Sequence, residues 1–187
     1  MRVRLSTCVQ MMRNCSLAEQ PRMKQNSIFR ELNMTEVDAE LEQRHLDAEA
    51  TIKGFSYKKP EGVEKGKGFI RLATSPLLKG VVQIVKKNSG ENNLHYHTSV
   101  DTFWMVLKGR VRFYGPGDVL MGEYGPYEGT VTPRFSRYWF ENCGEDDLEL
   151  LQVAASIKEG QKSGGRTDLS APKFDVADTL QFTAENK

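Results

Sequence analysis

HYHTSVDTFWMVLKG, residues 95–109, sets two histidines one residue apart ahead of a run of aromatic and aliphatic residues that a glycine closes. Alternate side chains of a β-strand share a face, so His95 and His97 point the same way and Tyr96 points to the other side. Two neutral imidazoles placed in this way can bind one transition metal ion at about 2.0–2.1 Å. The same spacing also occurs by chance, so the rest of the chain has to decide what the pair does.

Short runs of β-branched and aromatic residues surround this stretch. They read FIRLA, GVVQIV, RVRFYG, EGTVTP, RYWFEN and LELLQVAA, and turn-forming pieces such as KNSGENN, YGPGD and NCGEDD separate them. Regularly spaced short strands with no helix between them predict an all-β fold, a sandwich or barrel of antiparallel strands. We assign this barrel to residues 55–158.

The two ends of the chain differ from this central part. Residues 1–33 show no sustained period and are expected to be a flexible extension, while residues 159–187 begin as a loop and are expected to form a tail packed on the barrel or on a second subunit. Residues 34–54 predict an amphipathic helix that ends at Gly54. Its apolar stripe consists of Met34, Val37, Leu41, His45, Ala48 and Ile52.

Charge and hydropathy exclude two classes of partner. Lys and Arg together number 26 and Asp and Glu 25, so the net charge of +1 produces no broad field that would attract nucleic acid. The longest apolar runs are a few residues, far short of the roughly 20 that a membrane span needs. The sequence predicts specificity from a local site, with neither nucleic acid nor a membrane as partner.

Cysteine content indicates the compartment. The three cysteines form no C-x-x-C pair, and an odd number argues against a disulfide framework, so we expect a reducing, cytoplasmic location. The first 18 residues carry three arginines and no acid, as organelle-targeting leaders do, but lack the apolar segment of a secretory signal. A leader is therefore the alternative to a flexible extension.

The central stretch resembles the first motif of the cupin superfamily, which has a Gly, then H-x-H, then an acid, then a Gly that closes the strand. Here these places are Gly90, His95, His97, Asp101 or Thr102, and Gly109. The ends of the second cupin motif are matched by Pro133 and Asn142. The resemblance implies a jelly-roll barrel of two antiparallel sheets, a pocket inside it, a small-molecule ligand, one divalent transition metal (Fe, Mn, Ni or Zn) and a homodimer.

The second motif departs from the family pattern. Tyr138 stands in the place of its metal-binding His and Phe135 in the place of its Gly. His95 and His97 are thus the two predicted ligands, and the third is open. Asp101 would complete a two-His, one-carboxylate site if the preceding loop turns it inward, although Thr102 has the better register. Tyr138 could ligate as a phenolate or serve as a proton donor. Glu123, Glu128 or Glu141 could also enter from a neighbouring strand.

Alternation along the strands predicts the pocket wall. The predicted lining residues are Thr102, Trp104 and Val106 from one strand, Phe140 and Asn142 from another, and Phe135, Arg134 and Arg137 at the rim. Such a wall suits an aromatic or apolar ligand, and the rim arginines could bind a carboxylate. The leading hypothesis is a metal-dependent enzyme of the oxygenase, isomerase or lyase type. A binding cupin without catalysis is the second hypothesis, and an assembly role the third.

Overall fold

The computed structural model describes residues 36–158, 164–174 and 179–187, and the side chains from residue 38 onward. The chain divides into two compact units, residues 1–50 and residues 51–187, which we describe separately. The expected extension of residues 1–33, together with Met34, lies outside the described residues. Among the described residues, no helix is long and apolar enough to cross a membrane.

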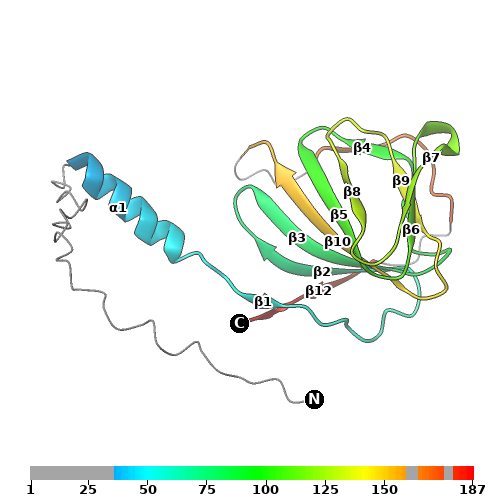
Figure 1. Ribbon diagram of the computed structural model, residues 1–187, viewed down its shortest axis with the longest axis horizontal. Coiled ribbons are helices and arrows are strands. Elements are labelled where there is room, and N and C mark those ends of the chain that lie inside the picture. Colours follow the sequence, from blue (N-terminus) through cyan, green and yellow to red (C-terminus); the bar gives the residue numbers. More distant parts are fainter. Residues whose placement is uncertain (1–35, 159–163, 175–178) are drawn as a thin grey trace, which may run out of the picture. The chain divides into compact units, whose positions relative to one another are not determined.

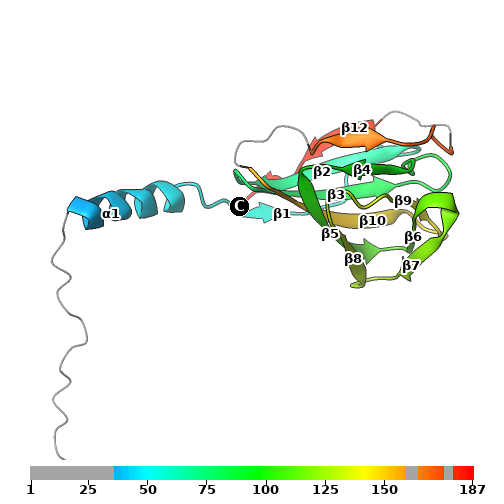
Figure 2. The ribbon, with the colours of Figure 1, turned by 90° about the horizontal axis from the view of Figure 1, so that it is seen from above.

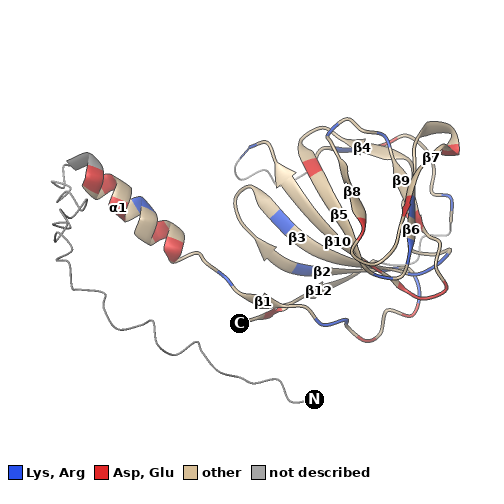
Figure 3. Cartoon of the chain, viewed as in Figure 1, with Lys and Arg blue, Asp and Glu red and all other residues tan. Residues whose placement is uncertain are grey.

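Helix α1 (Glu36–Glu49) is the described part of the first unit. Six of its 14 residues are Asp or Glu, spread along its length (Figure 3). It ends at Glu49, five residues before the predicted cap at Gly54, and the Ala50 amide closes its last turn on the Leu46 carbonyl. The two residues that follow Ala50 are β-branched Thr51 and Ile52, which lose side-chain freedom in a helix, so the chain leaves the helix there.

The largest sheet that the structure describes has six strands. Its order is β12 (Thr179–Thr183), β2 (Lys67–Thr74), β3 (Leu78–Val85), β10 (Leu148–Ser156), β5 (Val100–Lys108) and β8 (Gly129–Thr132). The pairs are antiparallel except β12 with β2, which is parallel, so the expectation of purely antiparallel sheets is wrong at this edge. A parallel neighbour is possible there because the chain returns to the sheet from a distant segment rather than through a hairpin.

A second wall faces this sheet (Figures 1 and 2). It consists of the sheet β7 (Leu120–Tyr124), β6 (Val111–Tyr114) and β9 (Trp139–Asn142), and of the pair β4 (His95–His97) with β11 (Arg166–Asp168). A β-bridge between His95 and Tyr138 connects the two pieces. The two walls make a jelly roll, which confirms the all-β prediction.

Three short elements complete the description. They are β1 (Phe55–Ser56), which pairs with β13 (Glu185–Asn186), and the 3-10 turn η1 (Pro116–Asp118). The six flanking runs and the run TFWMVLKG within residues 95–109 are all present as strands, namely β2, β3, β5, β6, β8, β9 and β10. The segment after residue 158, expected to be a tail, contributes strands β11, β12 and β13 to the sheets.

The main core lies between the two walls. Trp104 and Val106 of β5 pack there with Phe113 of β6, Phe140 of β9 and Leu150 of β10. A second cluster, which includes Ile70, Val82 and Ile84, covers the other face of the six-stranded sheet. The alternation in each strand therefore serves two cores, one inside the barrel and one outside it.

We predict that Phe140→Ala lowers the free energy of unfolding by about 3–5 kcal/mol, because the ring is fully buried and its removal leaves a cavity. Urea denaturation measures the change. Phe103→Ala is the matched control, since Phe103 is 46% exposed and lies on the outward face of β5. Equal losses for the two variants would contradict a core placed between the walls.

Candidate functional site inside the barrel

Strand β4, in the second wall of the barrel, carries the histidine pair. The His95 amide donates to the Tyr138 carbonyl at 3.1 Å, and the Tyr138 amide donates back to the His95 carbonyl at 3.0 Å. On its other side β4 pairs with β11, so that Arg166 lies opposite His97 and Asp168 lies opposite His95. Directly opposite residues share a face of the sheet, and this pairing brings an arginine and an aspartate beside the two imidazoles.

His95 is oriented by a backbone group. Its Nδ1 lies 2.7 Å from the Asn93 carbonyl oxygen, which can only accept, so Nδ1 carries the proton and Nε2 keeps its lone pair. Burial lowers the pKa of His95 to about 4, and the positive charge of Arg166 lowers it more than the charge of Asp168 raises it. The imidazole is therefore neutral at physiological pH, the state in which a metal ion or a donor can bind Nε2.

His97 is half-buried, and its ring centroid lies 5.1 Å from that of His95, nearly perpendicular to it. Burial and then Arg166 lower its pKa, against a smaller opposing effect of the Gly164 backbone. Its Nδ1 is buried and makes no hydrogen bond of good geometry to any described residue. The two imidazoles are thus adjacent and neutral, and each keeps a nitrogen available to a further group.

Tyr138 closes the site from the β9 side. Its ring lies 4.6 Å from the His95 ring, and the residue is 2% exposed. Burial raises the pKa of Tyr138 to about 12, although a hydrogen bond with Thr132 opposes this effect. Thr132 also accepts a hydrogen bond of 2.9 Å from the Trp104 indole. The phenol is therefore protonated at neutral pH, which suits a proton donor.

Asp101, the acid expected to join the histidines, is directed away from them. It lies on the outward face of β5, between buried Val100 and buried Thr102. Its carboxylate accepts a hydrogen bond of 2.8 Å from the Arg134 amide and faces the Arg134 guanidinium at 4.0 Å. The prediction that the preceding loop turns Asp101 inward therefore needs correcting, because strand alternation continues through residue 101 and leaves Thr102 inside.

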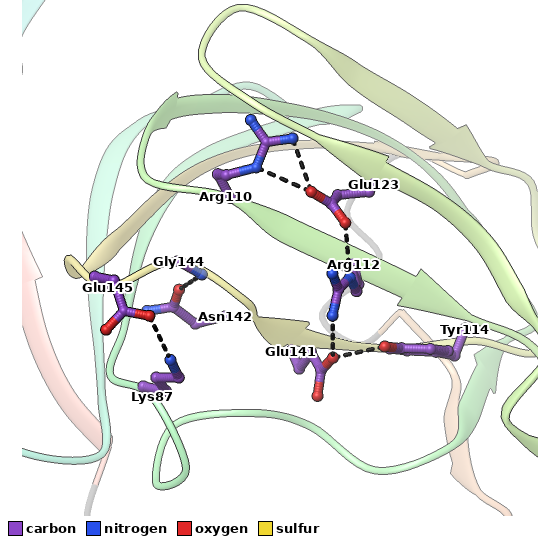
Figure 4. A network of polar contacts seen from close by, with 9 residues as sticks. All are labelled: Lys87, Arg110, Arg112, Tyr114, Glu123, Glu141, Asn142, Gly144 and Glu145. Atoms are coloured by element: carbon purple, nitrogen blue, oxygen red, sulfur yellow. Dashed lines mark hydrogen bonds and ion pairs between the residues drawn. The ribbon is translucent and has the colours of Figure 1, made fainter.

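The three glutamates considered as ligands have partners elsewhere. Figure 4 shows Glu123 between Arg110 and Arg112, with contacts of 2.8 and 2.7 Å, and these hydrogen bonds hold the pKa of Glu123 below its usual range. Glu141 accepts a hydrogen bond of 2.6 Å from the Tyr114 hydroxyl.

Glu128 caps a turn by accepting from the Gly125 amide at 2.7 Å. The described residues contain no group of three or more His, Cys, Asp or Glu side chains that could hold a metal ion. The structure therefore offers two imidazoles without an acidic third ligand in the part of the chain that it describes.

Comparison with known proteins finds likeness in structure alone. No protein-family model matches the chain, and no curated protein matches it. Among solved structures, KdgF from Halomonas sp. is 19% identical with a TM-score of 0.48, covering 56% of this chain and 94% of that chain. An RmlC-like cupin family protein from Methanocaldococcus jannaschii is 17% identical with a TM-score of 0.46, covering 56% and 91%.

A cupin superfamily protein from Desulfitobacterium hafniense is 15% identical with a TM-score of 0.45, covering 56% of this chain and 97% of that chain. The feature that decides the fold is the arrangement of two facing walls as a jelly roll, with the H-x-H strand β4 in the second wall. The chain has a jelly-roll fold. Similarities at this level carry no role, so the chemistry of the barrel has to be argued from its own residues.

Four of the predicted pocket residues line the interior of the barrel. Thr102, Trp104 and Val106 are buried along one face of β5, and Phe140 faces them from β9. The Phe140 and Trp104 ring centroids lie 5.5 Å apart. Because Val106 and Phe140 are fully buried in the core, they form the floor of the site rather than an open wall.

Asn142 is a structural residue rather than a pocket residue. Its side-chain amide donates to the carbonyls of Val85 and Asp146, and its carbonyl accepts from the Gly144 amide. These three bonds hold the turn that follows β9, so the predicted ligand contact needs correcting: the amide is already satisfied by backbone groups.

The three predicted rim residues lie on the surface. Arg134 and Arg137 are exposed, and Phe135 is 64% exposed, with its ring stacked 6.4 Å from that of Tyr96. Phe135 has a φ of 67°, in the left-handed region that glycine adopts freely. Glycine is the residue that the cupin motif has at this place. Tyr96 points to the outer side of β4, so this rim does not face the histidines.

Two charged residues that the sequence did not single out, Arg166 and Asp168, lie opposite the histidines in the β4–β11 pair, with side chains that are 40% and 57% exposed. The Arg166 Nε donates to Asp168 at 2.8 Å, and its Nη2 donates to Asn93 at 2.5 Å. Arg166 lies in a stretch expected to be a loop, and only its pairing with His97 brings it to the site. The alternation of Arg166 and Asp168 is the one local signal, and it is too short to predict a strand by itself.

Lys67 also points into the barrel. The half-buried side chain comes from β2, and its ammonium lies 5.1 Å from the ring centroid of Phe140 and 5.7 Å from that of Phe69. Burial lowers the pKa of Lys67 to about 7, the Arg166 charge lowers it further, and the Glu91 charge opposes this by a smaller amount. No sequence pattern distinguishes this lysine from its exposed neighbour Lys65.

The groove on the outer face of the six-stranded sheet is a different feature. It has a volume of about 530 Å³ and is lined mainly by apolar residues, among them Phe55, Leu72, Val82 and Leu151. It lies on the face opposite the inward-pointing side chains. We therefore place the candidate site in the barrel interior, where the titratable groups converge.

We predict that Lys67→Met stabilises the protein and removes part of the pH dependence of its stability. Because the folded pKa of Lys67 lies below its unfolded value, the unfolded chain binds more protons above pH 7, and the free energy of unfolding rises with pH. Urea denaturation of both proteins at pH 7 and pH 9 measures this. The difference in free energy of unfolding between the variant and the native protein should shrink towards pH 9. A difference that does not change with pH would contradict a desolvated ammonium.

Proposed function

We propose that this protein is an enzyme that acts on a small organic molecule inside its cupin barrel, with one divalent transition metal ion (Fe, Mn, Ni or Zn) bound by His95 and His97. The reaction would be of the oxygenase, isomerase or lyase type. A homodimer and a cytoplasmic location remain predictions from the sequence.

The orientation of His95 is the observation that carries the proposal. Its Nδ1–H donates to the Asn93 carbonyl, which fixes the tautomer and directs the Nε2 lone pair elsewhere. Histidines that ligate metals are commonly held by such a second hydrogen bond, because it sets the ring orientation and raises the basicity of the ligating nitrogen. The low pKa of the His95 imidazole also leaves Nε2 free to bind a metal ion, because a proton does not compete for it at neutral pH.

The chain's own residues would divide the work as follows. His95 and His97 hold the metal ion, which would polarise a substrate oxygen when bound. Tyr138 holds a proton on its hydroxyl beside the histidines and supplies it to the substrate. Trp104 and Phe140 form an aromatic floor that excludes water below the site.

A cupin that binds a small molecule without catalysis is the second candidate. The observation that favours it is the carboxylate of Asp101, which bonds to Arg134 instead of joining the histidines. The positive charge of Arg166 beside both imidazoles also opposes the binding of a bare cation. Metal content separates the two candidates.

We expect protein purified without a histidine tag to contain close to one transition metal ion per chain, measured by elemental analysis. The double variant His95→Ala, His97→Ala should lose it. The control is His45→Ala, which removes the exposed histidine of α1 and should leave the metal content unchanged. Native protein that carries no metal and cannot be loaded would refute the metalloenzyme and favour the binding cupin.

We expect Tyr138→Phe to keep its metal while losing activity by about 10²–10⁴-fold, the usual contribution of a positioned proton donor. The phenol is hydrogen-bonded to Thr132 and protonated, so metal binding does not require it. Elemental analysis of the variant tests this directly. Loss of the metal together with the hydroxyl would instead make Tyr138 a ligand.

A further inference from the structure

Lys67 is a cation inside the barrel that no acidic group neutralises directly. Among the described residues its Nζ takes part in no hydrogen bond and in no ion pair within 4 Å, whereas Arg166 beside it is paired with Asp168. Two phenyl rings, those of Phe69 and Phe140, flank the ammonium. A charge held in apolar surroundings without a partner is costly, and ionisable groups perturbed in this way cluster at functional sites.

Two acidic groups of this region already have partners. Asp168 accepts a hydrogen bond of 2.8 Å from Arg166. The carboxylate of Glu91 accepts from the amides of Asn88 and Gly90. Among the described residues, the Lys67 ammonium is therefore the charge that remains open to an anionic ligand.

A second buried group near Lys67 also lacks a partner. Gln83 is 4% exposed, and its amide nitrogen donates to Gln152 at 2.6 Å, but its Oε1 is buried without a hydrogen bond to any described residue. If the amide atoms of Gln83 and Gln152 are both exchanged, Gln152 donates to Gln83, and the Gln83 NH₂ faces the interior unpaired. Gln83 pairs across the sheet with Phe69, two residues from Lys67, so the amide and the ammonium are diagonal neighbours on the inner face.

We propose that Lys67 and the amide of Gln83 form a carboxylate-binding site inside the barrel, and that the ligand is a small planar organic acid held between Phe69 and Phe140. The ammonium pairs with one carboxylate oxygen, and the Gln83 amide, reversed together with that of Gln152, donates through its NH₂ to the other. This inference names the substrate class of the proposed enzyme, and it rests on that proposal only for the location of the ligand.

Benzoate and benzamide are the probes, because they have the same shape and differ in charge. Isothermal titration of the metal-free full-length protein should show benzoate binding at least about 30-fold more tightly than benzamide, the usual scale for a desolvated charge contact. Lys67→Met should abolish this preference without weakening benzamide, whereas Lys67→Arg should keep part of it. Lys65→Met, at an exposed position, is the matched control and should bind as the native protein does.

Gln83→Leu should weaken benzoate binding by about tenfold, since the substitution removes one hydrogen bond to a charged group. The proposal is overturned if the native protein binds no benzoate, if benzamide binds equally well, or if Lys67→Met retains the preference. Urea denaturation verifies that each variant is folded.

Metal content measured on each preparation as purified, before the metal is removed for the titration, keeps the two proposals separate. Lys67→Met that retains the metal but has lost the benzoate preference supports both proposals. Native protein without metal that still prefers benzoate refutes the enzyme alone and leaves the carboxylate site standing. Native protein with metal but no benzoate preference refutes the carboxylate site alone.

Discussion

The β-bridge between His95 and Tyr138 is the contact on which the site depends. It consists of two backbone hydrogen bonds, and it connects the β4–β11 pair with the sheet of β6, β7 and β9. Two further hydrogen bonds, from the Phe135 amide to the His97 carbonyl and from the Phe140 amide to the Asn92 side chain, support the same connection. The same bridge places the Tyr138 ring against the His95 ring. The two residues that connect the pieces of the second wall are therefore also residues of the candidate site.

The barrel interior divides into a packed floor and a polar region. Trp104, Phe113 and Phe140 pack against one another at centroid distances of 5.4 to 5.8 Å, which leaves the lower part closed. Above them the inward side chains are titratable or amide-bearing, and burial lowers the pKa of both histidines and of Lys67. Retaining these groups costs stability, and a stability cost concentrated on one side of a core is typical of functional sites.

The sequence predicted the strands well and the ligand set incompletely. Alternation placed Thr102, Trp104 and Val106 on one face, and the structure has them there because residue-by-residue alternation is a property of a single strand. The same rule, applied strictly, would have left Asp101 outside. The inward placement of Asp101 required an irregular loop, and its bond to the Arg134 amide shows that the strand stays regular. Asn142 matched the motif and was predicted to line the pocket, but its side chain stabilises the turn after β9.

By itself, the sequence determined the all-β class, the positions of the central strands and the shared face of His95 and His97, because these follow from side-chain periodicity within a few residues. The tertiary structure alone decided which charges surround the histidines. Arg166 and Asp168 reach them through a strand pairing across some seventy residues of chain, and Lys67 reaches the interior from the opposite sheet. Such contacts depend on which strands become neighbours, and no local pattern in one sequence specifies that choice.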